Sequence, residues 1–339
     1  MTTRRQFITG CGAMALAGVT RTNAAEPRPD GAATGRKPRA EYSARVAELL
    51  KTRDPFYEQH IAPDGTLIVA SAKVSKYAMA EAAHLIRMML AKRPDVMKKV
   101  TDRGIYICVM AYTEMTTDMP ECRGMSPWWD MRARGLGGNP LMCAEENLLC
   151  FKGDPWGGES IFVHEFAHIL QGAIMRTDGI SKEYFQAIFD KAKATGRFAG
   201  YGMNNTGEFW AEGVQAWFNC NGTIRGKFAG GQSSLEALGP DGKHLCHIRT
   251  RKQVKKHLPE LAKLLDKSFG GNKWSYTPPA KRLHQPHLHG YDPKKAPVFR
   301  WPKKVVEAFN RIDPKMKADQ ARRRKQAEEQ EERRKQDKK

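Results

Sequence analysis

The spacing of apolar residues predicts an α+β fold that begins near residue 42. Residues 66–74 (TLIVASAKV) and 105–112 (IYICVMAY) are short apolar runs typical of buried strands. A short helix is predicted at residues 44–50, and residues 75–99 place apolar side chains at helical spacing between the two strands. The order strand, helix, strand predicts a mixed sheet with the helix packed against it.

The middle of the chain alternates between loops and apolar helices. Residues 113–157 are rich in proline and glycine and read as loops, with one edge strand predicted at residues 147–151 (NLLCF). Residues 158–172 are apolar nearly all round, so this helix is expected to be buried. A second packed helix follows Asn205, a residue type that caps helix N-termini.

The last third becomes basic and polar. We expect turns up to about residue 242, a basic helix at residues 249–269, a proline-rich stretch at residues 270–302 and a short helix at residues 305–312. Residues 315–339 hold no large apolar side chain beyond Met316, which predicts either a solvated charged helix or a disordered tail.

The first residues have the composition of an export signal rather than of a folded element. Arg4 and Arg5 precede a weakly hydrophobic segment, residues 7–19, which resembles a twin-arginine signal with cleavage near Ala24. That segment is shorter than the roughly 20 residues of a transmembrane helix. The mature protein is therefore expected to be soluble, without a transmembrane segment, and periplasmic or extracellular.

Four regions follow from these patterns. They are a signal peptide at residues 1–24, a disordered linker at residues 25–41, a catalytic domain of one or two lobes at residues 42–312, and a charged tail at residues 313–339.

The net charge is +20, and it becomes +17 if the three arginines of the signal are removed. Such a surplus favours contact with anionic surfaces such as those of the cell envelope. We find no helix-turn-helix, zinc-finger or stacking-aromatic pattern, so no specific nucleic-acid partner is expected.

Removal of Cys11 with the signal leaves an even number of cysteines, which in an exported protein favours disulfides. Local spacing suggests Cys143 with Cys150 and Cys220 with Cys246, which leaves Cys108 with Cys122. None of these pairs has the two-residue spacing of a thiolate metal site.

The buried helix carries two histidines and a carboxylate. His164 and His168 are four residues apart and share a helical face, and Glu165 lies beside the first. Burying these groups without partners would cost roughly 2 kcal/mol or more each. A zinc ion bound by both imidazoles, with Glu165 as general base toward its water, removes that cost. The alternative is that both histidines are ordinary hydrogen-bonded core residues.

A third zinc ligand is expected on the following helix. Glu208 and Glu212 are one turn apart, and we assign Glu208 to the metal and Glu212 to the N–H of a ligating imidazole. The two roles could also be exchanged. The alternative for Glu208 is a capping carboxylate that accepts from the Asn205 amide, and for Glu212 a solvated charge.

Residues 156–220 resemble the gluzincin pattern of the lethal-factor-like metallopeptidases and the related Pro-Pro endopeptidases. The resemblance rests on His164-Glu165-Phe166-Ala167-His168, on Tyr201, and on Glu208-Phe209-Trp210-Ala211-Glu212. It implies a zincin-like fold, one zinc ion on His164, His168 and Glu208, and a peptide or protein substrate. It also implies that Tyr201 donates a hydrogen bond to the oxyanion, which a neutral phenol can do.

The sequence therefore predicts an exported zinc metallopeptidase, with the edge strand at residues 147–151 binding substrate backbone along the cleft. Two alternatives stay open: a non-catalytic cell-envelope binding protein with structural or no zinc, and a zinc amidase with a cell-wall substrate. His284, His287 and His289 suggest a second metal site, but a proline-rich loop gives them no common helical face.

Overall fold

The computed structural model describes residues 44–222 and 235–336. The predicted signal peptide at residues 1–24, the linker at residues 25–41 and the last three residues of the tail lie outside the described residues. So do residues 223–234, which belong to the predicted turn region.

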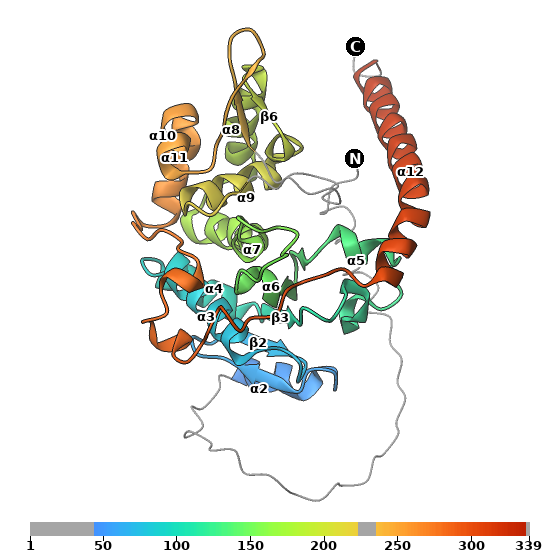
Figure 1. The fold of residues 1–339 in the computed structure, drawn as a ribbon. Helices are drawn as coiled ribbons and strands as arrows, with labels where there is room; N and C mark the ends of the chain where they lie inside the picture. Colours follow the sequence, from blue (N-terminus) through green and yellow to red (C-terminus); the bar gives the residue numbers. More distant parts are fainter. Residues whose placement is uncertain (1–43, 223–234, 337–339) are drawn as a thin grey trace, which may run out of the picture.

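A mixed five-stranded sheet forms the lower layer of the molecule in Figure 1. Its spatial order is β1-β2-β3-β5-β4. The parallel centre consists of β2, β3 and β5, and an antiparallel strand lies at each edge. The bounds are β1 Gln59–Ile61, β2 Leu67–Ala70, β3 Tyr106–Met110, β4 Gly135–Leu136 and β5 Leu141–Ala144. The mixed sheet predicted from the sequence is thus confirmed.

Both faces of this sheet are buried, as the continuous apolar runs of its central strands predict. Because successive side chains point to opposite faces, Ile68, Ile107 and Leu141 belong to one hydrophobic core, whereas Val69, Cys108 and Met142 belong to another. The first core extends to the helices that carry the site. The second extends to the C-terminal helix.

The predicted helix at residues 75–99 is two helices, α3 Lys76–Met89 and α4 Pro94–Asp102. Ser75 caps α3 by accepting from the Tyr77 amide. Pro94 occupies the first turn of α4, where its missing N–H costs nothing. Helix α2 Ala44–Thr52 agrees with the prediction for that region.

The segment at residues 147–151 is not an edge strand, contrary to the prediction. Residues Glu145–Leu148 form the short helix α6, and the edge of the sheet beside β5 is formed by the antiparallel strand β4. Asn147 explains the difference, because its side-chain oxygen accepts from the Ile161 amide and its amide donates to the Glu159 carbonyl. These bonds fold the segment back onto the start of the next helix.

The upper layer consists of helices and a small antiparallel sheet, ordered β6-β7-β8. Helix α7, which contains the histidine motif, lies between this layer and the large sheet (Figure 1). The bounds are α7 Ile161–Asp178, α8 Lys182–Ala194, β6 Phe198–Ala199, α9 Thr206–Trp217, β7 Glu236–Leu238, β8 His244–His247, α10 Arg251–His257 and α11 Pro259–Ser268. The single helix predicted at residues 249–269 divides at Pro259, which cannot donate a backbone hydrogen bond.

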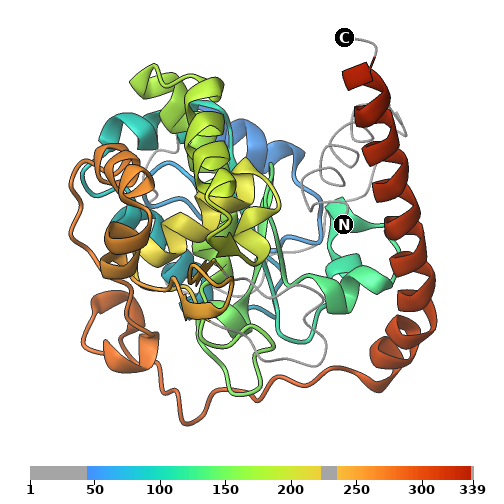
Figure 2. The ribbon, with the colours of Figure 1, turned by 90° about the horizontal axis from the view of Figure 1, so that it is seen from above.

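The C-terminal helix α12 spans Lys303–Gln336 and stands at the periphery beside α5 Trp128–Arg132 (Figures 1 and 2). It joins the short helix predicted at residues 305–312 to the charged tail, so the structure has no helix boundary at residue 313. Phe309 stacks on Trp128 with ring centroids 6.1 Å apart, and the Trp128 indole donates to Asp313 over 2.9 Å. These contacts attach the first turns of α12 to the second core.

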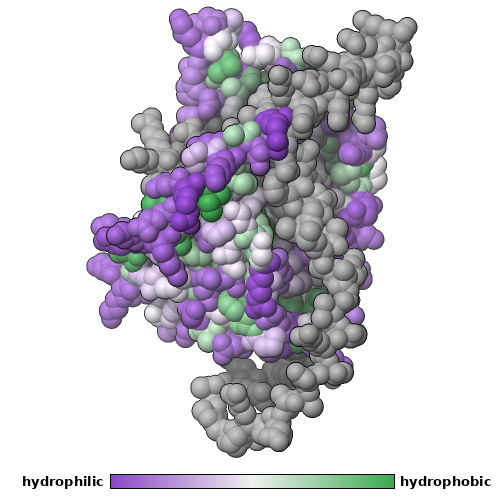
Figure 3. All heavy atoms as spheres, turned by 90° about the vertical axis from the view of Figure 1, so that its right-hand side faces the viewer, coloured by the Kyte–Doolittle hydropathy of each residue, from purple (hydrophilic) through white to green (hydrophobic). Residues whose placement is uncertain are grey.

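In the view of Figure 3 the described residues are mostly hydrophilic, and the hydrophobic ones form only small groups. Within residues 44–222 and 235–336, none of the helices has the length and apolar character needed to span a bilayer.

The six cysteines other than Cys11 all lie in the described ranges, and all are free thiols, so the three predicted disulfides are not formed in this structure. Cys143 lies in the first core, whereas the Cys150 sulfur is 3.3 Å from the Tyr276 hydroxyl. The remaining thiols also contact other groups, namely Cys108 with Glu121, Cys122 with Met142, Cys220 with the Gln215 carbonyl and Cys246 with His257.

Candidate metal centre

Helix α7 presents both histidines of the motif to helix α9. The Ser160 hydroxyl caps α7 by accepting from the Val163 amide, and Gly179 ends it in the left-handed conformation. One helical turn separates His164 from His168, so both imidazoles leave the same face. His164 is only 1% exposed, and His168 is partly buried.

Helix α9 brings the third group to the same point. Asn205 caps this helix as predicted, because its side-chain oxygen accepts from the amides of Gly207 and Glu208. The Glu208 carboxylate is directed at the two imidazoles. Its Oε2 lies 3.1 Å from Nε2 of His164 and 3.5 Å from Nε2 of His168. The two imidazole nitrogens are 3.3 Å apart.

These three distances fit a single zinc ion. Zinc binds imidazole nitrogen and carboxylate oxygen at about 2.0–2.2 Å, so two ligands of a tetrahedral ion lie about 3.4 Å apart. The triangle formed by His164, His168 and Glu208 has sides of 3.1, 3.3 and 3.5 Å. The donor set, two imidazoles and one carboxylate, is also one that zinc takes in catalytic sites.

The surroundings of the triangle are strongly negative. Burial alone would lower the pKa of His164, but its hydrogen bond to Glu208 and the charges of Glu165, Glu208 and Glu212 raise it to about 10. Burial would raise the pKa of Glu208, but the adjacent imidazoles hold it well below its usual range. Buried carboxylates that stabilise positive charge to this extent also favour a bound dication.

Glu212 lies behind the histidines, but a residue that the sequence reasoning missed is closer. Oε1 of Gln215 is 3.0 Å from Nδ1 of His164, whereas Oε1 of Glu212 is 3.7 Å from the same nitrogen. Gln215 in turn donates to the Ser160 carbonyl over 3.0 Å, and Glu212 accepts from the Asn221 amide. Gln215 follows Glu208 by seven residues, two helical turns, so the two lie on the same helical face, which is the only sign of Gln215 in the sequence.

Glu165 lies against the edge strand of the large sheet. It is fully buried, and a Cβ atom added to Gly137 would come within 2.8 Å of its carboxylate. A Cβ atom on Gly135, in β4, would meet Ile161 at 2.3 Å and Glu165 at 3.5 Å. Glycine at both positions thus lets the edge strand approach the histidine helix closely.

Tyr201 also lies close to His164. It directly follows β6 and Gly200 and begins a short 3₁₀ helix that packs against α9. Its ring centroid is 6.2 Å from that of His164. The structure therefore brings together all six residues that the sequence predicted for the site, namely His164, Glu165, His168, Tyr201, Glu208 and Glu212.

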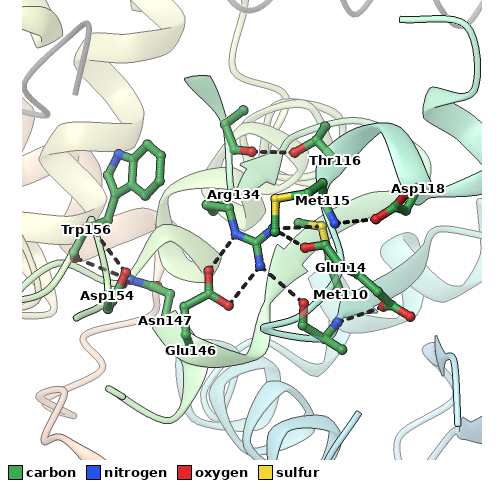
Figure 4. A network of polar contacts seen from close by, with 12 residues as sticks. Met110, Glu114, Met115, Thr116, Asp118, Arg134, Glu146, Asn147, Asp154 and Trp156 are labelled. Carbon is green, nitrogen blue, oxygen red and sulfur yellow. Dashed lines mark hydrogen bonds and ion pairs between the residues drawn. The ribbon is translucent and has the colours of Figure 1, made fainter. Parts of the chain in front are cut away.

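A buried ion pair fixes the start of the edge strand, as Figure 4 shows. Arg134 precedes β4, and its guanidinium forms two bonds of 2.6 and 3.0 Å to the carboxylate of Glu146. It also donates to the carbonyls of Ala111 and Glu114. Since both charged groups are fully buried, removal of one would leave the other without its partner.

The histidines of the proline-rich stretch do not form a metal site. His287 is 2.9 Å from the Glu81 carboxylate and stacks on His84 with ring centroids 4.2 Å apart. Arg282 donates to the same carboxylate. His284 and His289 are exposed, and neither belongs to a group of metal-binding side chains in the described ranges.

Comparison with protein-family models gives no match for this chain, and comparison with curated proteins gives none either.

Proposed function

We propose that the protein is an exported, zinc-dependent peptidase. The observation that carries this proposal is the triangle of ligand atoms from His164, His168 and Glu208, with sides of 3.1–3.5 Å. Three ligands leave one coordination position for water or substrate, whereas a structural zinc site normally has four protein ligands.

Zinc in this position would polarise the scissile carbonyl and lower the pKa of a water molecule. The residues around it divide the remaining work. Glu165 accepts the proton of the attacking water and then passes it to the leaving amine. Tyr201 donates a hydrogen bond to the oxygen on which negative charge develops. Gln215 and Glu212 lie on the Nδ1 side of His164 and hold its ring so that Nε2 faces Glu208 and His168, the residues with which it would bind the ion.

The position of strand β4 favours a peptide as the substrate. Among the strands of the described residues this strand pairs only with β5, and Gly135 in β4 and Gly137 directly after it lie beside Glu165. An extended peptide can add to such an edge as another strand and so align its backbone with the catalytic groups. The role first expected of residues 147–151 thus passes to β4.

The test is to compare zinc content and peptide cleavage in the untagged wild type, in Glu208→Ala and in Glu183→Ala. Glu183 is an exposed carboxylate on α8 and serves as the matched control. Glu208→Ala is expected to lower the zinc content by one ion per chain and to abolish cleavage of a mixed peptide library. Glu183→Ala is expected to behave as wild type.

The other outcomes discriminate between the alternatives. An unchanged zinc content in Glu208→Ala would move the third ligand to Glu212 or elsewhere. Zinc without cleavage of any peptide, but with release of products from cell-wall fragments, would favour a zinc amidase. A wild type that binds no zinc after reconstitution would favour a non-catalytic envelope-binding protein.

A further inference from the structure

A second group of metal-binding side chains lies on the small sheet. Glu236 on β7 and His244 and His247 on β8 each offer a ligand atom, and these atoms lie within 4.8 Å of one another. Nδ1 of His247 is 3.7 Å from Oε1 of Glu236, and the two imidazole centroids are 4.6 Å apart. No step of the proposed peptidase reaction uses these three residues.

An irregularity in the strand pairing brings the two histidines together. In a regular strand, residues three apart point to opposite faces of the sheet. Here Ala237 pairs with Cys246 and Leu238 pairs with His244, so Leu245 is an extra residue in β8. A bulge of this kind reverses the facing of the residues beyond it. His244 and His247 therefore both lie on the face of Glu236, which pairs directly with His247.

The rest of the hairpin agrees with this assignment. The Cys246 sulfur lies 3.7 Å from the imidazole of His257, on helix α10. Leu245, the bulged residue, is 61% exposed although it is a large apolar side chain. In a regularly paired strand, Leu245 would have a partner on β7. Because the bulge leaves this apolar side chain exposed, burial of apolar surface does not explain the bulge.

We propose that Glu236, His244 and His247 bind a second zinc ion at the surface. Two imidazoles and one carboxylate suit zinc better than calcium or magnesium, which prefer oxygen ligands. The ligand atoms need to approach from at most 4.8 Å to about 3.4 Å, which small side-chain rotations can supply. His244 is exposed, so the ion can enter from solvent and waters can complete its coordination.

A zinc ion on the small sheet would also affect the structure near the first metal site. Glu236 pairs with Ala199 on β6, two residues before Tyr201. A zinc ion that joins β7 to β8 would stabilise the sheet from which Tyr201 emerges. This second site does not depend on the proposed peptidase activity.

The test is a zinc titration of the metal-free, untagged full chain followed by calorimetry. The wild type is expected to bind two ions in two separate phases. His244→Ala is expected to weaken the second phase by at least about 100-fold, since even outer partners of a ligand contribute 10–100-fold. The same variant is expected to leave the first phase unchanged. His168→Ala is expected to lose the first phase and keep the second.

His289→Ala is the control, because His289 is an exposed histidine outside the group. Hydrogen exchange gives a second measurement, in which the second zinc ion is expected to slow exchange of the β7 and β8 amides in the wild type and not in His244→Ala. A second phase that survives in His244→Ala and in His247→Ala would overturn the proposal. A wild type that binds one ion only, with the β7 and β8 amides unaffected, would overturn it as well.

Discussion

A substitution at Glu165 tests the proposed catalysis separately from metal binding. Glu165 follows His164 in the chain but is not one of the three residues in the ligand triangle. Glu165→Gln is expected to retain zinc and to lower the rate of peptide cleavage about 10²–10⁴-fold, the usual contribution of a general base. His164→Ala is expected to lose zinc and activity together. Cleavage at the wild-type rate by Glu165→Gln would show that the proposed mechanism is wrong.

Glu145 gives a stability prediction at the same scale. Burial raises the pKa of its carboxyl to about 7, with further contributions from the charges of Glu146 and Glu114. The folded state therefore prefers the protonated form. The stability that the protonated Glu145 carboxyl contributes is fully present below its pKa in the unfolded chain, about 4.5, and is lost as the pH rises through about 7.

Glu145→Gln removes this pH dependence and keeps an oxygen that accepts from the Ser75 amide. The free energy of unfolding of the variant minus that of the wild type is expected to increase by about 1–3 kcal/mol from pH 5 to pH 8. Urea denaturation at both pH values measures the difference. An equal difference between variant and wild type at both pH values would argue against a raised pKa.

Gly137 connects the edge strand to the site at the scale of elements. A Cβ atom there would meet the Glu165 carboxylate at 2.8 Å, so Gly137→Ala is expected to displace the base and to lower turnover at least tenfold while zinc is retained. Peptide cleavage and zinc content are the two measurements.

Gly172→Ala is the matched control for Gly137→Ala. It lies within α7, and its Cβ would meet only the flexible Arg176 side chain, at 3.3 Å. Turnover as low in Gly172→Ala as in Gly137→Ala would mean that close approach to Glu165 is not the cause.

The sequence predicted the elements whose signals are local and missed those that depend on distant partners. The period-four spacing of His164 and His168 and the cap at Asn205 placed α7 and α9 correctly. The edge strand was assigned to residues 147–151 because they are apolar. In the structure, the two-residue strand β4 forms this edge of the sheet, and the buried ion pair of Arg134 and Glu146 holds its start in place. Nothing in the local pattern around Gly135 indicates a strand.

The same limit applies to the site. Glu208 was predicted from its place one helical turn before Glu212 and from the resemblance to the gluzincin pattern, and its carboxylate lies within 3.5 Å of both imidazoles. Gln215 was missed, because a polar residue two turns away becomes a histidine partner only through the way in which α9 packs on α7. Gly137 does lie in a loop, directly after β4, as predicted for residues 113–157, but its proximity to Glu165 arises from the sheet and could not be predicted.

At the scale of the whole molecule, α12 combines a part that packs against the second core with a highly charged part. Its first turns are attached through Phe309, which is 6% exposed and belongs to the second core with Trp128. Residues 315–339 are almost entirely polar or charged, apart from Met316 and three alanines. The contribution of α12 to stability is therefore expected to reside in residues 303–316, which hold all of its described side chains that pack against the second core.

Two variants test this division. Phe309→Ala is expected to lower the free energy of unfolding by about 3 kcal/mol, because it removes a buried ring and leaves a cavity against Trp128. A chain that ends after Arg322 is expected to change it by less than about 0.5 kcal/mol, because the sequence of residues 323–339 has no large apolar side chain to bury. Chemical denaturation of both, with zinc held constant, measures the difference. A large loss on truncation would show that the charged part of α12 packs against the fold, and a small loss for Phe309→Ala would show that α12 is not part of the core.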